Sequence, residues 1–529
     1  MRKLAILAFG LLLAAGSPAA ASPAAATKKP SPPHHSSSRS GRSPAIDPIF
    51  HAYDRKDSPG CALAVVERGK VVEARGYGMA SLEHDRPIDA DTVFDIGSAA
   101  KQFTAASVVL LSLDGKLALD DDVRRYVPEL PASGIPFTIR QLLHHTSGLR
   151  DYTGLLPLAG ARTPDLTTER EALEMLARQK GVEFPPGTRY QYCNSGFFLL
   201  SIVVERASGK TLRDFAKERI FGPLGMTSTR FVRDSREVIP RRATGYARAR
   251  KEPAGGPEFH VAMSDWEQNG DGGLQTSARD LARWDHNFEQ PAVGGAKMIE
   301  ELTRTGTLSD GKPIDYALGL RVDRDEGILR VRHGGSWAGF KAEFLRYPER
   351  RLSVIVTCNV RDAVPSRLAR AVAALYLPEL ARKPAAAGEA SPAPPPSAAA
   401  TSASDSAALA GLYWSERRLE IRRVSFENGK AFYQESAGGK PQPLVALGNG
   451  RFRLQSSAVE VAFENDPGAP ASGEKHIVER DPEEGTSEWR RVKPAAPADP
   501  ARFAGTYYCD ELDAVFRTRN LVLESDPLR

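Results

Sequence analysis

Cysteine is scarce in this sequence, and long apolar runs are missing after its first segment. The 529 residues include only four cysteines, too few to hold a chain of this length together as a disulfide scaffold. Beyond the N-terminal segment, no stretch reaches the roughly 18 consecutive apolar residues of a membrane-spanning helix. With 41% hydrophobic residues, the sequence predicts a protein that folds around a hydrophobic core and has no transmembrane segment.

Strong charge of one sign is also missing. The formal net charge is +5, and the arginines are scattered, with no basic block that alternates with aromatic residues. These features give little support to nucleic-acid binding. The histidine pairs at 34–35 and 144–145 have no Cys, Asp or Glu at the spacing of metal ligands. We therefore expect no metal site.

The N-terminal 21 residues have the pattern of a secretory signal peptide. Basic residues at 2–3 precede a short apolar run, and small residues at 19–21 stand before Ser22. We expect cleavage after Ala21 and export to the periplasm or the medium.

Export would permit disulfide bonds, although four cysteines allow few of them. Cys61 and Cys358 lie in the strand-like runs CALAVVE and LSVIVTCN. They either pair, if those strands are neighbours, or stay as buried thiols. Cys509 is expected to have no partner.

Composition divides the rest of the chain into four parts. Residues 22–43 are rich in Ser, Pro, Ala, Lys and Arg, as in a flexible spacer. Residues 44–382 have strand-like runs at both ends and helical patterns between them, which predicts an α+β domain with an antiparallel sheet packed against a helical region. Residues 383–405 form a Pro/Ala/Ser linker. Residues 406–529 contain short alternating strands, typical of a small all-β module.

A weak internal repeat lies inside the all-β module. The segment LAGLYWSERRLEIRR at 409–423 resembles FAGTYYCDELDAVFR at 503–517. The second copy is either an incomplete module or an extra pair of strands.

The stretch FDIGSAAKQFTAASVVLLSL, residues 94–113, contains a candidate nucleophile and its base. Ser98 and Lys101 are three residues apart at the start of an apolar run, so they share one face of a helix. A serine hydroxyl attacks only when a base takes its proton, and a lysine can be that base when burial lowers its pKa. Two other Ser-x-x-Lys pairs, at 309–312 and 472–475, lie in turn-like sequences with no apolar run after them.

Tyr192 and Asn194, in YCNSGFFLL, form a second candidate motif. A tyrosine near a lysine can pass a proton to a leaving group, and an asparagine amide can orient a substrate carbonyl or hold the lysine. The alternative is structural, with Tyr192 packed in the core and Asn194 capping the helix that follows.

The third motif is HGGSWAGF, which begins at His333. Gly334 and Gly335 let a substrate approach the backbone closely, and N–H groups at such an edge can hold an oxyanion. The alternative is a glycine-rich turn with a surface histidine. Ser336 is not predicted to be a nucleophile, because its surroundings miss the last glycine of G-x-S-x-G and lead into a strand.

In this order, Ser-x-x-Lys, Tyr-x-Asn and His-Gly-Gly resemble the motifs of the serine β-lactamase-like hydrolases. The resemblance is greatest to the class C branch, with its penicillin-binding-protein relatives, D-aminopeptidases and esterases. The stretches TIRQLLHHTSGLRDY, GDGGLQTSARDLARW and YALGL agree with it, and it extends over residues 44–362. It implies a β-lactamase/transpeptidase-like fold, and the C-terminal module resembles the lipocalin-like β-domains of some relatives. That module is either passive or extends a loop over the active site.

The resemblance also implies roles for these residues. Ser98 would be the acylated nucleophile and Lys101 its general base, while Tyr192 would share proton transfer. Asn194 would help hold the substrate, and the backbone N–H groups of Ser98 and Ser336 would form an oxyanion hole. His333, Gly334, Gly335 and Ser336 would line the substrate-binding edge.

His333 departs from the pattern of the β-lactamases and carboxypeptidases in the family. Their residue at this position is typically a lysine that fixes a substrate carboxylate, whereas histidine is commoner in the esterase and peptidase-like relatives. A neutral imidazole is a weaker anion anchor at pH 7, although Arg332 or Arg150 could supply a cation.

We therefore expect an exported serine hydrolase that acts on an ester, a short amide or a D-amino-acid peptide and uses neither a metal nor an organic cofactor. In family terms it would be an esterase or a D-Ala-type carboxypeptidase or aminopeptidase. The alternatives are a penicillin-binding sensor without turnover, a β-lactamase proper, and an interaction protein that works through its β-module. The expected partner is a small-molecule or peptide substrate, and the sequence leaves the oligomeric state open.

Overall fold

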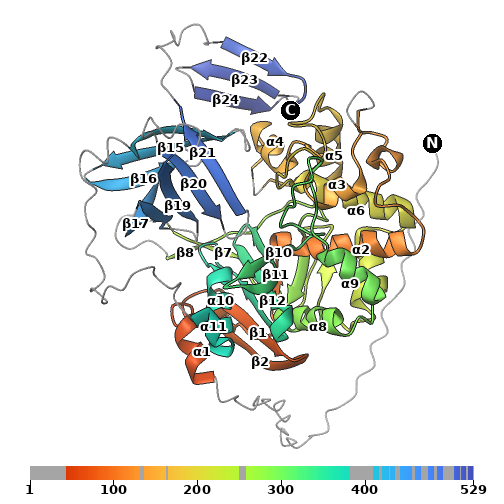
Figure 1. The fold of residues 1–529 in the computed structure, drawn as a ribbon, viewed down its shortest axis with the longest axis vertical. Helices are drawn as coiled ribbons and strands as arrows, with labels where there is room; N and C mark the ends of the chain where they lie inside the picture. Colours follow the sequence, from red (N-terminus) through yellow and green to blue (C-terminus); the bar gives the residue numbers. More distant parts are fainter. Residues whose placement is uncertain are drawn as a thin grey trace, which may run out of the picture. The chain divides into compact units, whose positions relative to one another are not determined.

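The computed structural model describes most of the chain from Ser43 onward (Figure 1). The described residues are 43–131, 136–162, 165–249, 258–381, 409–415, 420–427, 429–434, 441–448, 450–455, 459–465, 475–481, 485–492, 505–512, 514–519 and 522–527. The predicted signal peptide, the predicted linker and all but the last residue of the predicted spacer lie outside them.

A six-stranded antiparallel sheet organises the first part of the chain, in the order β10-β11-β12-β13-β1-β2. Its strands are β1 (Cys61–Glu67), β2 (Lys70–Tyr77), β10 (Arg321–Asp325), β11 (Ile328–Trp337), β12 (Phe340–Tyr347) and β13 (Leu352–Cys358). Because β1 pairs with β13, strands from the two ends of this region lie side by side in one sheet, a pairing that the sequence left open.

Both faces of this sheet are buried. Along β1, Ala62 and Ala64 face one hydrophobic cluster, whereas Leu63 and Val65 face another, because successive side chains of a strand point to opposite faces. The first cluster includes helix α8 (Ala278–Glu289), and the second includes α1 (Ser43–Phe50) and α10 (Pro365–Tyr376). Burial on both faces explains why CALAVVE is apolar without alternation.

Helices make up most of the region between β2 and β10. Helix α2 (Lys101–Leu113) is buried on nearly all sides and packs against α6 (Asn194–Ser208), which agrees with its mainly apolar sequence. The other α-helices are α3 (Ile139–Leu143), α4 (Tyr152–Leu158), α5 (Glu169–Ala177), α7 (Leu212–Ala216), α9 (Gly295–Thr303) and α11 (Pro378–Ala381). Shorter helical turns are η1 (Gly97–Ala100), η2 (Val123–Arg125), η3 (Lys217–Phe221) and η4 (Pro348–Arg350).

Small sheets complete this region. Strands β5 (Val93–Asp95), β9 (Leu274–Ser277) and β6 (Arg230–Phe231) form one sheet, and β5 leads directly into η1. The other two pairs are β3 (Met79–Ser81) with β4 (Arg86–Pro87), and β7 (Tyr246–Arg248) with β8 (Phe259–Val261).

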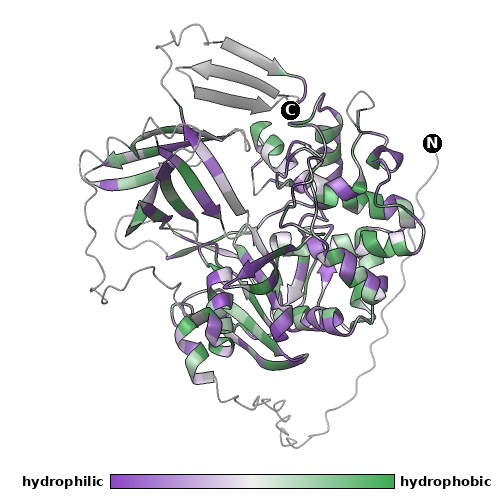
Figure 2. Cartoon of the chain, viewed as in Figure 1, coloured by the Kyte–Doolittle hydropathy of each residue, from purple (hydrophilic) through white to green (hydrophobic). Residues whose placement is uncertain are grey.

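The predicted all-β module contains a closed eight-stranded barrel, β14 to β21. Its strands are β14 (Gly411–Ser415), β15 (Glu420–Glu427), β16 (Lys430–Gln434), β17 (Gln442–Gly448), β18 (Arg451–Leu454), β19 (Glu460–Asn465), β20 (Lys475–Asp481) and β21 (Gly485–Arg491). Figure 2 shows hydrophilic and hydrophobic residues mixed along these strands, and buried Tyr413, Tyr433 and Trp489 belong to the barrel's own core. The second copy of the repeat lies in a separate sheet of β22 (Gly505–Cys509), β23 (Ala514–Arg519) and β24 (Val522–Pro527).

Cys61 and Cys358 are partners in the β1–β13 register and form a disulfide. The structure therefore favours pairing over the alternative of two buried thiols. Cys509 is a free cysteine, as expected, and so is Cys193.

Within the part of the chain that the structure describes, no helix has the length and apolar character needed to cross a membrane.

Replacing Cys61 and Cys358 together with serine should lower the free energy of unfolding by about 2–4 kcal/mol. The cross-link joins residues 297 positions apart, so its loss gives the unfolded chain many more conformations. Denaturant unfolding of the double variant, with Cys509→Ser as the matched control, measures the effect. A double variant as stable as the wild type would contradict this prediction.

Candidate active site

A cavity of about 830 Å³ brings the three predicted motifs together. The predicted residues that line it are Ser98, Tyr192, Asn194, His333, Gly334 and Ser336. Lys101 is fully buried beside Ser98. Gly335 lies where β11 presses against the turn that carries the serine.

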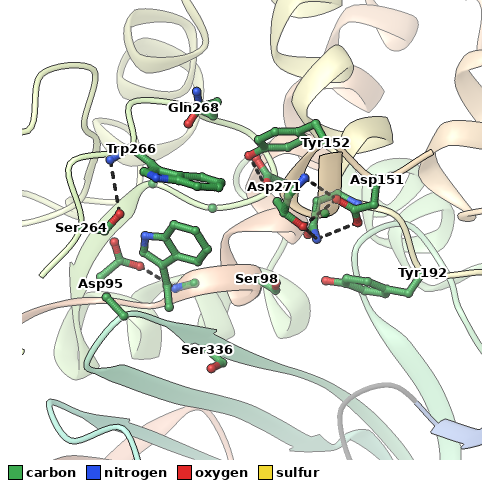
Figure 3. A pocket seen from close by; sticks show the side chains of 18 of the residues that line it. Asp95, Ser98, Asp151, Tyr152, Tyr192, Ser264, Trp266, Gln268, Asp271 and Ser336 are labelled. Carbon is green, nitrogen blue, oxygen red and sulfur yellow. Dashed lines mark hydrogen bonds between the residues drawn. The ribbon is translucent and has the colours of Figure 1, made fainter. Parts of the chain in front are cut away.

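A constrained turn presents Ser98 to the cavity. Strand β5 ends at Asp95, whose carboxylate accepts the backbone N–H of Gly97 at 2.7 Å (Figure 3) and the side-chain amide of Gln275 at 3.0 Å. Gly97 has φ of +49°, and a Cβ there would lie 2.6 Å from the backbone nitrogen of Ser336. Only glycine fits this position, for both reasons.

The same close packing explains Gly335. A Cβ at Gly335 would lie 1.8 Å from the carbonyl oxygen of Ile96, so any side chain would push β11 away from the turn. The two glycines thus hold the backbone of Ser336 beside the backbone of Ser98.

Ser98 and Lys101 are in contact, although they lie on different helical elements. Ser98 lies on the 3₁₀ turn η1, and Lys101 is the first residue of α2. A 3₁₀ turn has three residues per turn, so side chains at i and i+3 lie over each other. Lys101 Nζ is 3.1 Å from Ser98 Oγ.

Lys101 has two more partners, and both can only accept hydrogen bonds. Its Nζ donates to Asn194 Oδ1 at 2.8 Å and to the carbonyl oxygen of Asp271 at 2.8 Å. A neutral amine has two hydrogens for these two acceptors, and its lone pair then faces the hydroxyl of Ser98. This is the arrangement that a general base requires.

The surroundings of Lys101 favour its neutral form more than water does. Burial lowers the pKa of Lys101 to about 8, against the opposing influence of the carboxylates of Asp271 and Asp151. At pH 7 about a tenth of the Lys101 side chains are therefore neutral and able to accept a proton, and at pH 8 about half of them are.

Asn194 is held in one orientation by Asp151. Asp151 Oδ2 accepts the side-chain N–H of Asn194 at 2.9 Å and its backbone N–H at 2.7 Å. A carboxylate only accepts, so the amide oxygen of Asn194 must face Lys101. Asp151 also caps α4 by accepting the backbone N–H of Thr153.

The ring of Tyr192 also lies close to Lys101. Lys101 Nζ is 4.8 Å from the centroid of the Tyr192 ring, and the ring of His145 packs against the tyrosine at 4.2 Å between centroids. In Figure 3 the hydroxyl end of Tyr192 points toward Ser98. Its position is compatible with either role considered from the sequence, packing or proton transfer.

His333 is buried rather than at the surface, and it carries no charge at neutral pH. Its Nδ1–H donates to the carbonyl oxygen of Gly334 at 2.6 Å, so Nε2 accepts the hydroxyl of Tyr316 at 2.8 Å. Burial, and secondly the nearby Lys101, lower the pKa of His333 to about 3. This imidazole therefore cannot be a cationic anchor for a substrate carboxylate.

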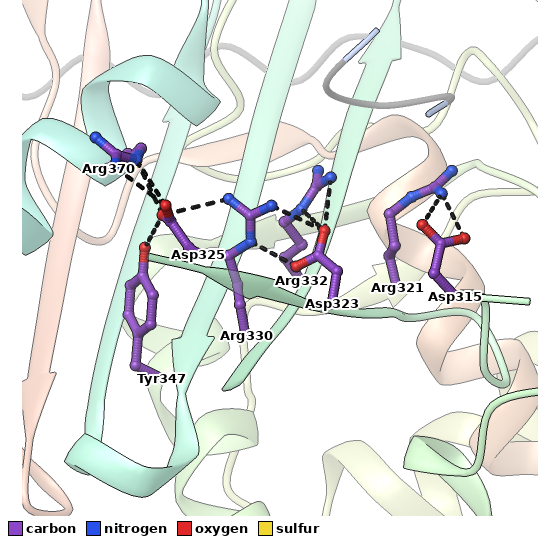
Figure 4. Close-up of polar contacts among 8 residues, drawn as sticks. All are labelled: Asp315, Arg321, Asp323, Asp325, Arg330, Arg332, Tyr347 and Arg370. Atoms are coloured by element: carbon purple, nitrogen blue, oxygen red, sulfur yellow. Dashed lines mark hydrogen bonds and ion pairs between the residues drawn. The ribbon is translucent and has the colours of Figure 1, made fainter. Parts of the chain in front are cut away.

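The two arginines considered as substitutes for that cation are already paired. Arg332 lies 3.3 Å from Asp323, within a row of ion pairs along β10 and β11 (Figure 4). Arg150 donates to Gln179 at 2.8 Å and pairs with Glu511.

Several polar residues at the site were not predicted from the sequence. They are Asp151, Tyr152, Asp271 and Tyr316. Asp151 directly precedes the helix of YTGLLPL, so an N-cap pattern could have indicated it. The others have no local signal, because their neighbours come from distant parts of the chain. Among the described residues, no group of three or more His, Cys, Asp and Glu is arranged to hold a metal ion.

The sequence profile of the Beta-lactamase family matches residues 46–413, most of the chain. This protein belongs to the Beta-lactamase family. The β-lactamase/transpeptidase-like fold expected from the three motifs is thereby confirmed, together with a C-terminal β-barrel.

Three relatives show how much of the chain is similar to other proteins of the family. A D-aminopeptidase of Gluconobacter oxydans is 29% identical over 471 residues, which cover 87% of this chain and 81% of that protein. Penicillin-binding protein 4* of Bacillus subtilis is 28% identical and covers 79% of this chain and 93% of its own length. A D-aminopeptidase of Cereibacter sphaeroides is 33% identical, but the match covers only 57% of each protein.

Solved structures of the family are similar as well. The octameric penicillin-binding protein homologue from Pyrococcus abyssi has a TM-score of 0.58 at 21% identity and covers 85% of this chain and 98% of its own. A D-amino acid amidase from Ochrobactrum anthropi has a TM-score of 0.50 at 25% identity, over 60% of this chain and 91% of its own.

Proposed function

We propose that this protein is a serine hydrolase that cleaves amides or short peptides of D-amino acids through an acyl-enzyme on Ser98. One observation carries the proposal: a buried lysine with a lowered pKa lies 3.1 Å from the hydroxyl oxygen of a serine that lines a large cavity. Such a pair has the geometry and the basicity that an activated serine needs.

The reaction has two halves. Ser98 Oγ attacks the carbonyl carbon of the substrate while Lys101 Nζ takes the hydroxyl proton, and the N–H groups of Ser98 and Ser336 stabilise the oxyanion. The tetrahedral intermediate then expels the amine, which receives the proton from Lys101, directly or through Tyr192. Water attacks the resulting ester by the same steps in reverse, which releases the acid and regenerates Ser98.

The substrate class is supported by two considerations. Relatives of similar length and a structural neighbour carry the names D-aminopeptidase and D-amino acid amidase. In addition, a neutral His333 with both ring nitrogens in hydrogen bonds disfavours substrates that depend on a fixed carboxylate, as β-lactams and carboxypeptidase substrates do.

Export is part of the same proposal. It is supported by the signal-peptide pattern of residues 1–21 and by the disulfide between Cys61 and Cys358, a bond typical of oxidising compartments.

Steady-state hydrolysis of four compounds tests the proposed function. They are D-alanine p-nitroanilide, its L-isomer, p-nitrophenyl acetate and a chromogenic cephalosporin. We expect kcat/KM for the D-anilide to exceed that for the L-anilide by at least about 10-fold, with the cephalosporin slower than the D-anilide. Preference for the cephalosporin would instead make the protein a β-lactamase. No turnover, with Ser98 still labelled by a fluorescent penicillin, would make it a sensor.

A further inference from the structure

The side chain of Asp271 stands out among the carboxylates of the cavity. It is only 8% exposed. Its Oδ2 accepts the hydroxyl of Tyr152 at 2.9 Å (Figure 3), but its Oδ1 is buried and finds no hydrogen-bond donor among the described residues. A buried acceptor without a donor costs free energy, so this atom requires an explanation.

The other two aspartates of the cavity are already occupied. Both oxygens of Asp95 accept hydrogen bonds, from Gly97 and Gln275. Both oxygens of Asp151 do so as well, from Thr153 and Asn194. Of these three aspartates, Asp271 is the one with a carboxylate oxygen, Oδ1, that accepts no hydrogen bond from the described residues.

Asp271 lies close to the reacting atoms. The same nitrogen, Lys101 Nζ, bonds to the carbonyl oxygen of Asp271 at 2.8 Å and to Ser98 Oγ at 3.1 Å. In an α-amino acid, the amino nitrogen is attached to the carbon next to the acyl carbon. When the acyl carbon is bonded to Ser98, the amino group is therefore near the backbone of Asp271, and Asp271 and Ser98 line the same cavity.

The surroundings also suit a cation. Trp266 and Trp337 line the same cavity with 5.2 Å between their ring centroids, and the Trp266 ring is 6.4 Å from that of Tyr152. The faces of aromatic rings attract ammonium groups, especially where water is excluded.

We propose that Asp271 accepts the α-ammonium group of the substrate, so that the enzyme requires a free amino terminus. This inference rests on the proposed function, because it concerns the same acyl group on Ser98. Burial raises the pKa of Asp271 to about 6, so the carboxylate is ionised at pH 8 before the substrate enters. Binding an ammonium replaces the missing donor at Oδ1 with a charge-assisted hydrogen bond.

The test compares D-alanine p-nitroanilide with its N-acetyl derivative at pH 7.5, in the wild type and in Asp271→Asn. We expect the variant to lower the ratio of kcat/KM for the free amine to kcat/KM for the acetylated compound by at least about 20-fold, because a neutral amide loses the charge-assisted bond. If Asp271 acted only through Lys101, both substrates would slow by the same factor. An unchanged ratio would overturn the proposal.

Asp95→Asn is the matched control, since it also changes a buried carboxylate of the cavity to an amide. We expect it to slow both substrates by similar factors and to leave their ratio within about 3-fold. If Asp271→Asn does not fold, Asp271→Ser removes the same charge with less volume, and the same ratio decides.

A separate measurement keeps this proposal distinct from the proposed function. D-Alaninamide at millimolar concentration should protect Ser98 from a fluorophosphonate label, whereas N-acetyl-D-alaninamide should not, and Asp271→Asn should abolish the protection. Protection without any hydrolysis would mean that the proposed function is wrong while the ammonium site stands. Equal protection by both compounds, or protection that survives in the variant, would overturn the ammonium site.

Discussion

Replacing Ser98 with alanine is expected to reduce kcat/KM by at least about 10⁴-fold and to abolish labelling by a fluorophosphonate. Without the hydroxyl there is no atom to form the acyl-enzyme, and the Lys101 amine then has no proton to remove. The rate of spontaneous hydrolysis of p-nitrophenyl acetate, measured without enzyme, sets the lowest activity that the assay can detect.

Ser309→Ala is the matched control for this change. Ser309 belongs to another Ser-x-x-Lys pair, but its side chain is exposed and Lys312 pairs with Asp310 at 2.7 Å. The control should keep both hydrolysis and labelling. A Ser98→Ala protein that is still labelled at wild-type rate would remove Ser98 from the mechanism.

Lys101→Arg is expected to lower kcat/KM by about 10²–10⁴-fold at pH 8, because a guanidinium cannot give up its proton and act as a base.

The pH dependence of kcat/KM of the wild type should report the pKa of this lysine. Its active form is the neutral amine, so kcat/KM should rise about 10-fold for each pH unit below the pKa of about 8 and level off above it.

An uncharged ester is the proper substrate for this pH profile, because its own groups do not titrate between pH 5 and 9.5. The apparent pKa belongs to Lys101 and Tyr192 together if the two residues exchange protons. Lys312→Arg is the control and should leave the profile unchanged. A wild-type profile that is flat between pH 6 and 8 would contradict a lysine base.

The local sequence was a good guide to the residues that lie close to one another along the chain. Ser98 and Lys101 could be identified because three residues make one turn of helix, so their contact depends on a few backbone angles. The helix after them could be identified because most of its residues are apolar. The order of the three motifs indicated the family, which the family profile confirms. The disulfide remained one of two alternatives, because whether β1 and β13 are neighbours depends on how the whole sheet assembles.

The tertiary structure decided what surrounds those residues. Asp271 and Tyr152 are 119 residues apart in the sequence, and their contact leaves one carboxylate oxygen without a donor. Tyr316 leaves His333 with no nitrogen for a substrate carboxylate. The pKa of Lys101 depends on burial by many segments at once. The sequence shows which groups can react. Which of them are shielded from water, and which charges are paired, depends on contacts between residues that are far apart in the sequence, so only the folded protein determines them.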